Sequence, residues 1–494
     1  MKLTVQAGNP LEWSTPALVV GCITEPTGTP LFDAVNTALG GLPARMYESK
    51  EFSGKRGTVK AIHTLGALPA QQVMLVGVGD AKEITPERIR QAAGAAVQAL
   101  VAAKISSAAS VLHQSASMTG LLEASLEGFS LGAYRYDCYK TKDRQPVVLE
   151  KVTALCTDAE TANRAALAAE RVRMVCDAVR MARDLISAPG NVATPFHLAE
   201  KALEIGGQYG IHCTILHKEE LEQLGMGALL AVGQGSQYPP RMVVMEYQGA
   251  ETTGNPTALV GKGITFDTGG ISLKPGANMD LMKQDMAGGA AVLGAMQAAA
   301  ALKLPINLVA LIPLAENMPD GRACKPGDIV TTLSGQTVEI NNTDAEGRLI
   351  LCDALQYVQR FTPAAIIDLA TLTGACVVAL GHNATGAMGN DSELFSALAK
   401  AGDATGERLW ELPLWEEYGE LMKSDIADLK NSGGPHAGTI SAGWFLKQFV
   451  GTYKWVHLDI AGTAWEDKGR HYLPKGATGV GVRLLVEYLR TIAG

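Results

Sequence analysis

The segment 342–349 reads NTDAEGRL and places two carboxylates and a guanidinium within five residues. Carboxylates such as those of Asp344 and Glu346 supply the oxygen ligands that hard divalent cations prefer. Arg348 follows two residues after Glu346, where its guanidinium can bind an anion or a developing oxyanion. The pattern therefore indicates a cation site that also handles an anion.

A second segment with similar chemistry lies earlier in the chain, in the glycine-rich stretch 261–270 and the residues after it. Lys262 and Asp267 are five residues apart, and Asp285 follows eighteen residues later. Glycines at 263, 269 and 270 allow the backbone to turn and to approach a ligand closely. We expect a glycine-rich loop here, then a helical segment carrying Asp285, with the three side chains in one pocket.

Each of these residues also has an ordinary structural interpretation. An aspartate in a glycine-rich stretch is most often a turn or capping residue, and Lys262 alone would be a solvated charge. The methionines and glycines around Asp285 instead indicate a packed setting. Burying several carboxylates together is costly unless cations neutralise them. Because the nine histidines are dispersed and no H-E-x-x-H motif occurs, oxygen ligands must dominate any metal site.

The elements that must position these residues alternate between strands and helices. In the second half of the chain, the apolar runs 258–260, 306–314, 365–369 and 456–460 predict strands buried on both faces of a sheet. The candidate residues follow directly after three of these runs. Since ligand sites in open α/β sheets lie beyond the carboxyl ends of strands, this placement suits a single site.

The first 160 residues show the same alternation, with β-branched runs at 17–22, 73–78 and 147–155 and an alanine-rich helical stretch at 86–103. A helical pattern over 159–186 lacks Gly and Pro and ends at the turn formers 187–191. We therefore predict an α/β protein of two domains. A smaller N-terminal α/β domain covers 1–160, a linker helix covers 161–187, and a larger catalytic α/β domain with a mixed sheet flanked by helices covers 188–494.

Composition limits the classes of partner. The chain has 42 Lys+Arg, 50 Asp+Glu and a formal net charge of −8, so it lacks the bulk basic character typical of proteins that bind nucleic acid or anionic membranes. Its eight cysteines are scattered without a C-x-x-C pair, which is typical of reduced thiols. The longest uncharged apolar stretch, 287–302, is short and interrupted by glycine. We expect a cytoplasmic protein without a membrane anchor.

The segments 261–285 and 342–349 resemble, in residue type, order and spacing, the two metal-binding motifs of the leucine aminopeptidase family of two-metal cytosolic exopeptidases. The resemblance extends through 187–195, 370–375, 428–431 and 459–462, and is weaker over the first 160 residues. It implies two divalent ions per subunit, Mn²⁺ or Zn²⁺, bridged by Asp267 and Glu346. Asp344 would complete the shell of one ion, and Lys262 and Asp285 would complete that of the other.

The same resemblance implies two catalytic residues. A water held between the ions would attack the first peptide bond of a substrate whose free α-amine ligates one metal. Lys274 would polarise the carbonyl oxygen. Arg348 would hold a bicarbonate that transfers protons, since a guanidinium cannot itself act as the general base. The implied activity is the release of N-terminal leucine and other apolar residues from short peptides.

Substrate contacts are also implied by the resemblance. The residues expected to touch the substrate are, for its first side chain, Met282, Thr371, Gly374 and Ala461, and for its backbone, Asn342 and Leu372. A pocket of methionine and small residues favours Leu or Met side chains. Ordinary core filling is the alternative interpretation of Met282.

Other functions stay open at this point. Carboxylate-bridged ions also serve phosphoryl transfer, so a two-metal phosphatase is one alternative, although a lysine ligand and a methionine-lined pocket argue against it. A DNA-binding or regulatory role, found in some bacterial relatives, is another, with the segment 135–144 as its candidate surface. The resemblance also implies a homohexamer that would admit short peptides and exclude folded proteins.

Overall fold

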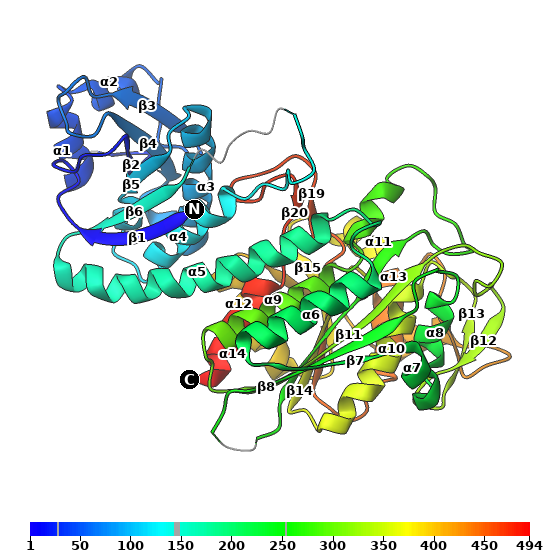
Figure 1. Ribbon diagram of the computed structural model, residues 1–494. Helices are drawn as coiled ribbons and strands as arrows, with labels where there is room; N and C mark the ends of the chain where they lie inside the picture. The colour runs from blue at the N-terminus through cyan, green and yellow to red at the C-terminus, as the bar shows by residue number, and fades with distance from the viewer. Residues whose placement is uncertain (27–28, 143–148, 252–253) are drawn as a thin grey trace. The chain divides into compact units, whose positions relative to one another are not determined.

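The computed structural model describes residues 1–26, 29–142, 149–251 and 254–494. They form two compact units, Met1–Asp177 with Asp467–Lys475, and Ala178–Glu466 with Gly476–Gly494. Each unit contains one large β-sheet covered by helices (Figure 1), which confirms the predicted α/β class. The units divide inside helix α5 (Ala159–Ser187), which matches the helical pattern predicted over 159–186. No helix in the described part of the chain is long and apolar enough to cross a membrane.

The first unit is built on a sheet with the strand order β1-β6-β5-β2-β4-β3. Its strands are β1 (Lys2–Ala7), β2 (Ala17–Ile23), β3 (Val59–His63), β4 (Gln72–Gly79), β5 (Ser107–Ser110) and β6 (Lys151–Cys156). Its helices are α1 (Pro30–Ala38), α2 (Leu42–Glu48), α3 (Pro86–Ala102) and α4 (Leu121–Gly132), with short 3₁₀ turns η1 (Ala81–Glu83) and η2 (Leu112–Gln114). Of the segment 135–144 considered for DNA, residues 143 and 144 lie outside the described residues, as do residues 147 and 148 of the run predicted as a strand.

Alternating side chains of β2 explain why this sheet is covered on both faces. Ala17 and Val19 pack in one cluster with α3 and α4, whereas Leu18 and Val20 pack in another with α1 and α2. Because successive strand residues point to opposite faces, a continuous apolar run requires an apolar partner on each side.

A short return of the chain, Asp467–Lys475, belongs to the first unit. Tyr472 is buried there, and its hydroxyl donates a hydrogen bond to Glu87 of α3 at 3.2 Å. Gly94 of α3 has to be glycine, since a Cβ at this position would lie 2.5 Å from the Tyr472 amide nitrogen. The boundaries predicted from the sequence do not contain this return.

The second unit is built on a nine-stranded sheet with the order β16-β15-β18-β14-β9-β11-β8-β7, and β10 pairs with β11 beside this path. Its strands are β7 (His212–Leu216), β8 (Arg241–Gln248), β9 (Thr257–Gly261), β10 (Gly263–Asp267), β11 (Asn307–Asn317), β14 (Ala365–Ala370), β15 (Thr385–Gly389), β16 (Leu409–Glu411) and β18 (Trp455–Asp459). A small sheet contains β12 (Asp328–Thr331), β13 (Thr337–Ile340) and β17 (Leu429–Lys430), and a hairpin contains β19 (Trp465–Glu466) and β20 (Gly476–Ala477).

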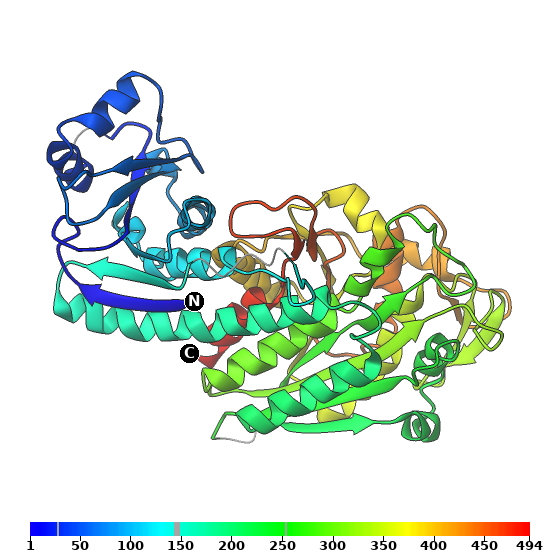
Figure 2. The same cartoon turned by 45° about the horizontal axis from the view of Figure 1, so that its top comes forward.

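Helices cover both faces of the nine-stranded sheet (Figures 1 and 2). One face packs against α6 (Pro195–Tyr209) and α9 (Ala287–Ala301), with α14 (Val482–Ala493) packed on α9, and the other against α8 (Gly227–Gly233), α10 (Glu346–Val358) and α13 (Gly438–Lys447). The remaining helical elements are α7 (Lys218–Leu224), α11 (Gly374–Leu380), α12 (Ser392–Thr405), η3 (Met279–Gln284), η4 (Gln359–Phe361) and η5 (Glu416–Met422).

The centre of this sheet determines where the candidate residues meet. Strands β18, β14, β9, β11 and β10 pair in parallel, so their carboxyl ends lie at one edge of the sheet. The predicted strands over 258–260, 306–314, 365–369 and 456–460 correspond to β9, β11, β14 and β18 and are confirmed. The mixed sheet is also confirmed, because β8 and β15 pair antiparallel with their neighbours.

Two local predictions were wrong. The stretch 261–270 is not a single glycine-rich loop, since it contains β10 and Asp267 is the last residue of that strand. Asp285 does not lie within a helix, because it ends the 3₁₀ turn η3 just before α9 begins. In both cases pairing and packing with distant segments outweigh the local composition.

Candidate active site

Lys262 lies in the single-residue gap between β9 and β10 and is 2% exposed. Its Nζ is 2.8 Å from Asp285 Oδ2 and 2.8 Å from Glu346 Oε1, and it donates a hydrogen bond to the Thr371 carbonyl oxygen. Burial opposes the ammonium charge, but the nearby carboxylates prevail and raise the pKa of Lys262 above its ordinary value. Metal ligands predicted from two distant segments therefore meet here.

Lys274 connects two other predicted ligands. Its Nζ lies 2.8 Å from Asp267 Oδ2 and 2.5 Å from Asp344 Oδ1. Asp267 Oδ1 accepts hydrogen bonds from the Gly269 amide and from Asn317 Nδ2, which fixes the carboxylate at the end of β10. Burial, followed by the charge of Glu346, raises the pKa of Asp267 to about 6.

Four carboxyl groups thus face two ammonium groups in one cluster, in which Asp344 and Lys274 are only partly buried. Oxygens of Asp267, Asp344 and Glu346 lie within 4.8 Å of one another, and Asp285 joins them through Lys262. Glu346 Oε2 is buried and has no hydrogen-bond partner within the described part of the chain. An unpartnered buried oxygen in a cluster with excess negative charge fits a divalent cation, which takes oxygen ligands and supplies the missing charge.

Gly347 explains why a glycine stands inside the 342–349 segment. A Cβ at this position would lie 2.7 Å from both Nζ and Cε of Lys262, so any side chain here would displace the lysine. Glu346 and Gly347 form the first turn of α10, and the close approach of this turn to Lys262 brings the two predicted segments together.

Arg348 lies in the same turn of α10 and is buried. Its Nη1 donates a hydrogen bond to the Asn431 carbonyl oxygen at 2.8 Å, while its Nε is buried without a hydrogen-bond partner among the described residues. Burial lowers the pKa of Arg348 to about 10, although Glu346 and Asp459 oppose this effect. An N–H donor without a partner in this position is available to an anion.

Three of the residues predicted to contact substrate hydrogen-bond at the carboxyl edge of the sheet. Thr371 follows β14, and its Oγ1 donates to Asp285 Oδ1 at 2.7 Å. The amides of Leu372 and Ala461 both donate to Asp459 Oδ1.

The other three predicted substrate residues lie in neighbouring turns. The side-chain oxygen of Asn342 accepts a hydrogen bond from the Asp344 amide. Met282 is half-buried in η3, and Gly374 is exposed at the start of α11, where an added Cβ would meet open space.

Comparisons with known proteins show the family of this chain. Residues 180–486 match the catalytic domain of the cytosol aminopeptidase family, and residues 19–143 match its N-terminal domain. The chain belongs to the cytosol aminopeptidase family. It is therefore an aminopeptidase of a metal-dependent family, as the resemblance of the two motifs predicted.

Similar proteins cover the chain almost end to end. Proteins named probable cytosol aminopeptidase from Geobacter sp. (strain M21) and Geobacter sulfurreducens are 55% and 56% identical over 99% of this chain and 100% and 99% of their own. A solved mutant of tomato leucine aminopeptidase aligns with a TM-score of 0.89 at 33% identity, covering 99% of this chain and 96% of its own. The bottromycin maturation enzyme BotP in complex with Mn aligns with a TM-score of 0.86 at 34% identity, covering 97% and 100%.

Sequence reasoning assigned no role to two residues that organise the candidate site. Asn431 is fully buried, and its side chain bonds the amides of Asn341 and Asn342 and the carbonyls of Asn342 and Ala345. Asn317 ends β11 and donates to Asp267 and to the Thr343 carbonyl. The resemblance includes Asn431 within 428–431 but gave it no role, and Asn317 lies in none of the matching segments, so neither residue was predicted to organise the site.

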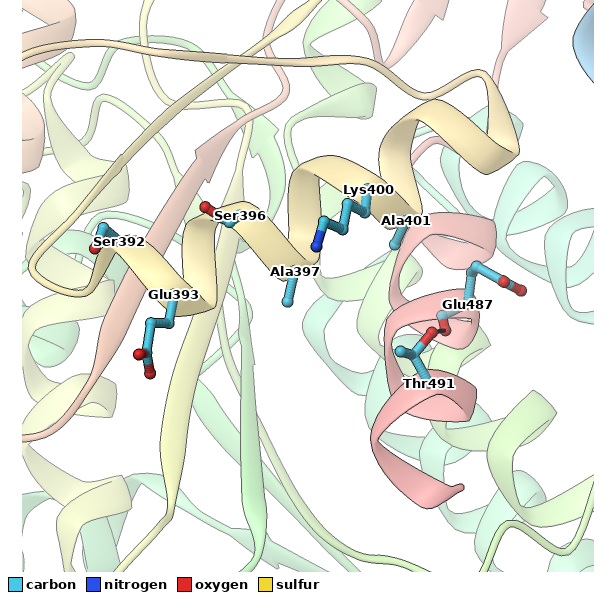
Figure 3. A pocket seen from close by; sticks show the side chains of 8 residues that line it. All are labelled: Ser392, Glu393, Ser396, Ala397, Lys400, Ala401, Glu487 and Thr491. Carbon is cyan, nitrogen blue, oxygen red and sulfur yellow. Dashed lines mark hydrogen bonds between the residues drawn. The ribbon is translucent and has the colours of Figure 1, made fainter.

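A groove of about 530 Å³ lies away from these groups, between α12 and α14. Its lining side chains are mostly small or polar and come from the two helices (Figure 3), among them Ser396, Lys400 and Thr491. None of its residues belongs to the carboxylate cluster, and we assign it no part in the aminopeptidase reaction.

Proposed function

We propose that this aminopeptidase uses two divalent ions to release N-terminal leucine and other apolar residues from short peptides. The observation that carries the proposal is the excess of carboxyl groups over ammonium groups in the cluster around Lys262 and Lys274, together with the unpartnered Glu346 Oε2. Asp267, Asp285, Asp344 and Glu346 would supply carboxylate ligands to the ions, and Lys262 would supply an amine ligand.

When bound, the ions would lower the pKa of a water and polarise the peptide carbonyl. For Lys262 to donate its lone pair as a ligand, its Nζ has to give up a proton, which a neighbouring dication favours. Lys274 keeps its proton in this scheme, and its ammonium donates a hydrogen bond to the carbonyl oxygen as negative charge develops there. Because this cluster is buried, such an interaction is stronger than it would be in water.

Arg348 supports the proton transfers in this proposal. Its unpartnered Nε and its place in the first turn of α10 favour a bound anion such as bicarbonate, since the amino end of a helix and a guanidinium both attract negative charge. A bicarbonate can accept and return a proton, whereas the guanidinium cannot.

The proposed preference for apolar side chains rests on the composition of the pocket. Met282, Thr371, Gly374 and Ala461 would surround the first side chain, and a flexible methionine with small neighbours leaves room for leucine. Asn342 and Leu372 would bind the peptide backbone.

We propose Mn²⁺ or Zn²⁺ as the resident ions. The similar structure of BotP in complex with Mn supports Mn²⁺. We also propose a homohexamer. Exposed apolar side chains of the second unit, among them Val378, Trp410 and Trp415, support an assembly that would cover them.

The test of the proposed function is a substrate panel with the Mn²⁺- and Zn²⁺-loaded protein. We expect ammonia release from L-leucinamide, slower release from glycinamide, none from N-acetyl-L-leucinamide, and no turnover of p-nitrophenyl phosphate. The acetylated compound is the matched control, because it differs from L-leucinamide only in its blocked amine. Turnover of the phosphate ester without release from L-leucinamide would favour the phosphatase alternative.

A further inference from the structure

We infer that Asp459 is a positioning residue that holds the walls of the substrate side-chain pocket in place. The inference rests on the proposed function, because it takes the residues around 371–374 and 461 as that pocket. Asp459 is the last residue of β18 and is fully buried. It is not one of the predicted metal ligands, and its hydrogen bonds go to the two segments that follow β14 and β18.

The carboxyl group of Asp459 joins these two segments directly. Its Oδ1 accepts hydrogen bonds from the Leu372 amide at 3.2 Å and from the Ala461 amide at 3.1 Å. Its Oδ2 accepts a hydrogen bond from the Thr373 hydroxyl at 2.7 Å. One side chain therefore fixes two residues predicted to contact substrate, together with the residue that lies between Leu372 and Gly374.

The segment 371–373 is also attached to the carboxylate cluster, through Thr371. Thr371 Oγ1 donates to Asp285 Oδ1, and the Thr371 carbonyl accepts from Lys262 Nζ. Residues 371–373 are thus held between the predicted ligands on one side and Asp459 on the other. Removing Asp459 would leave Thr371 attached but release Leu372 and Thr373, so we expect pocket shape to change more than metal binding.

The direction of the hydrogen bonds shows why an acceptor is required at this position. Thr373 Oγ1 accepts from the Cys376 amide at 3.1 Å and lies 3.0 Å from Thr439 Oγ1. With the Cys376 amide and the Thr439 hydroxyl as donors to this oxygen, the single Thr373 proton is left for Asp459. The network thereby ties Asp459 to the first turn of α11, which begins at Gly374.

Asp353 provides a matched control. It is also fully buried, and its two oxygens accept the amides of Leu229 and Leu333 at 2.9 and 2.8 Å. None of these partners belongs to the predicted pocket. A purely structural role for Asp459 predicts that alanine at either position has the same consequences, namely lower stability with unchanged selectivity.

The test compares Asp459→Ala, Asp459→Asn and Asp353→Ala in the metal-loaded protein. For Asp459→Ala we expect the KM for L-leucinamide to rise about tenfold, the equivalent of roughly 1.4 kcal/mol, and the preference for L-leucinamide over glycinamide to shrink. Asp459→Asn should recover only part of the loss, since its oxygen accepts the two amides, whereas its amide group cannot accept the Thr373 proton. Asp353→Ala should unfold at a lower temperature without a change in KM or preference.

A second pair of variants keeps the inference testable if Asp459→Ala does not fold. Thr373→Val removes the hydroxyl that binds Asp459, and Thr373→Ser retains it, so only the valine variant should lose preference for leucine over glycine. Unchanged KM and unchanged preference in Asp459→Ala, or in Thr373→Val if the alanine variant is unfolded, would overturn the inference.

Calorimetric binding of L-leucine and glycine to the Mn²⁺-loaded protein separates this result from a failure of the proposed function. Tighter binding of L-leucine to the wild type, weakened in Asp459→Ala, would support the pocket role even if turnover were absent. Equal affinities of the wild type and Asp459→Ala for L-leucine would contradict it, whatever the turnover.

Discussion

Two buried ionic clusters in the second unit differ in whether all of their carboxyl oxygens have partners. Glu407 and Arg483 form a balanced pair 3.1 Å apart, and the second oxygen of Glu407 accepts the amides of Gly481 and Leu484 at the start of α14. Every oxygen of Glu407 thus has a partner. In the cluster around Lys262, the carboxyl groups outnumber the ammonium groups and Glu346 Oε2 has no hydrogen-bond partner among the described residues.

The difference shows that burial of charge does not by itself mark a functional site. A buried pair whose polar atoms are all satisfied stabilises a particular packing arrangement, here the junction between the segment 405–407 and α14. A cluster with unsatisfied oxygens destabilises the protein unless a ligand completes it. Variants of the two clusters should therefore separate effects on activity from effects on stability.

The largest expected effect comes from Asp344→Ala. The substitution removes one predicted ligand, so metal content measured by mass spectrometry should fall below that of the wild type. Loss of several kcal/mol of transition-state stabilisation should lower kcat/KM for L-leucinamide by about a thousandfold or more. Wild-type metal content and activity in this variant would contradict the assignment of the cluster.

Glu407→Gln should act on stability alone. The change leaves Arg483 buried without its carboxylate, which costs about 3 kcal/mol of unfolding free energy. Urea unfolding of metal-free protein measures this loss, and kcat/KM of the folded fraction should match the wild type. A fall in kcat/KM at temperatures where the variant is folded would remove the proposed distinction between the two clusters.

Lys274→Ala should separate metal binding from rate within the carboxylate cluster. The variant lacks the proposed donor to the carbonyl oxygen, so kcat should fall about a hundredfold, as it does when one oxyanion donor is lost. Metal content should stay at the wild-type level, because Lys274 is not a predicted ligand. Reduced metal content would instead assign Lys274 a role in building the site.

At Asp353 we expect no effect on catalysis and only a change in how stability depends on pH. Its oxygens are satisfied, but it has no cationic partner in its two hydrogen bonds. Burial raises its pKa from 3.8 to about 7. Between these values the folded protein holds a proton that the unfolded chain has lost, so this group's contribution to stability falls as the pH rises from about 4 to 7. In Asp353→Asn this slope should be absent, so the difference in unfolding free energy between the variant and the wild type should change with pH by up to about 4 kcal/mol across this range. If the unfolding free energies of the variant and the wild type changed in parallel across this pH range, the result would contradict this prediction.

Much of the second unit's architecture was predictable from local patterns. The runs that became β9, β11, β14 and β18 are mostly apolar because both faces of the central sheet are covered. Strand β10 could not be predicted from such a pattern. It contains Gly263 and Thr265, and it is a strand because it pairs with β11.

The candidate site also has features that were predictable from the sequence and features that were not. Ligand types and their spacing were readable from 261–285 and 342–349, since a metal site needs several oxygen donors and its chemistry limits the residues that supply them. The roles of Asn431 and Asp459 were not readable. Each is an ordinary polar residue in sequence, and each acts on segments roughly ninety residues away through hydrogen bonds that exist only after the sheet has formed.

The sequence by itself determined the α/β class, the family resemblance and the candidate metal-binding residues, because hydrophobic periodicity and ligand chemistry are local properties. Only the tertiary structure decided that Lys262 packs against Gly347, that Glu346 keeps one oxygen without a partner, and that Asp459 joins two strand ends. These are consequences of parallel strands ending at one edge, which brings distant residues into contact at distances that no local pattern encodes.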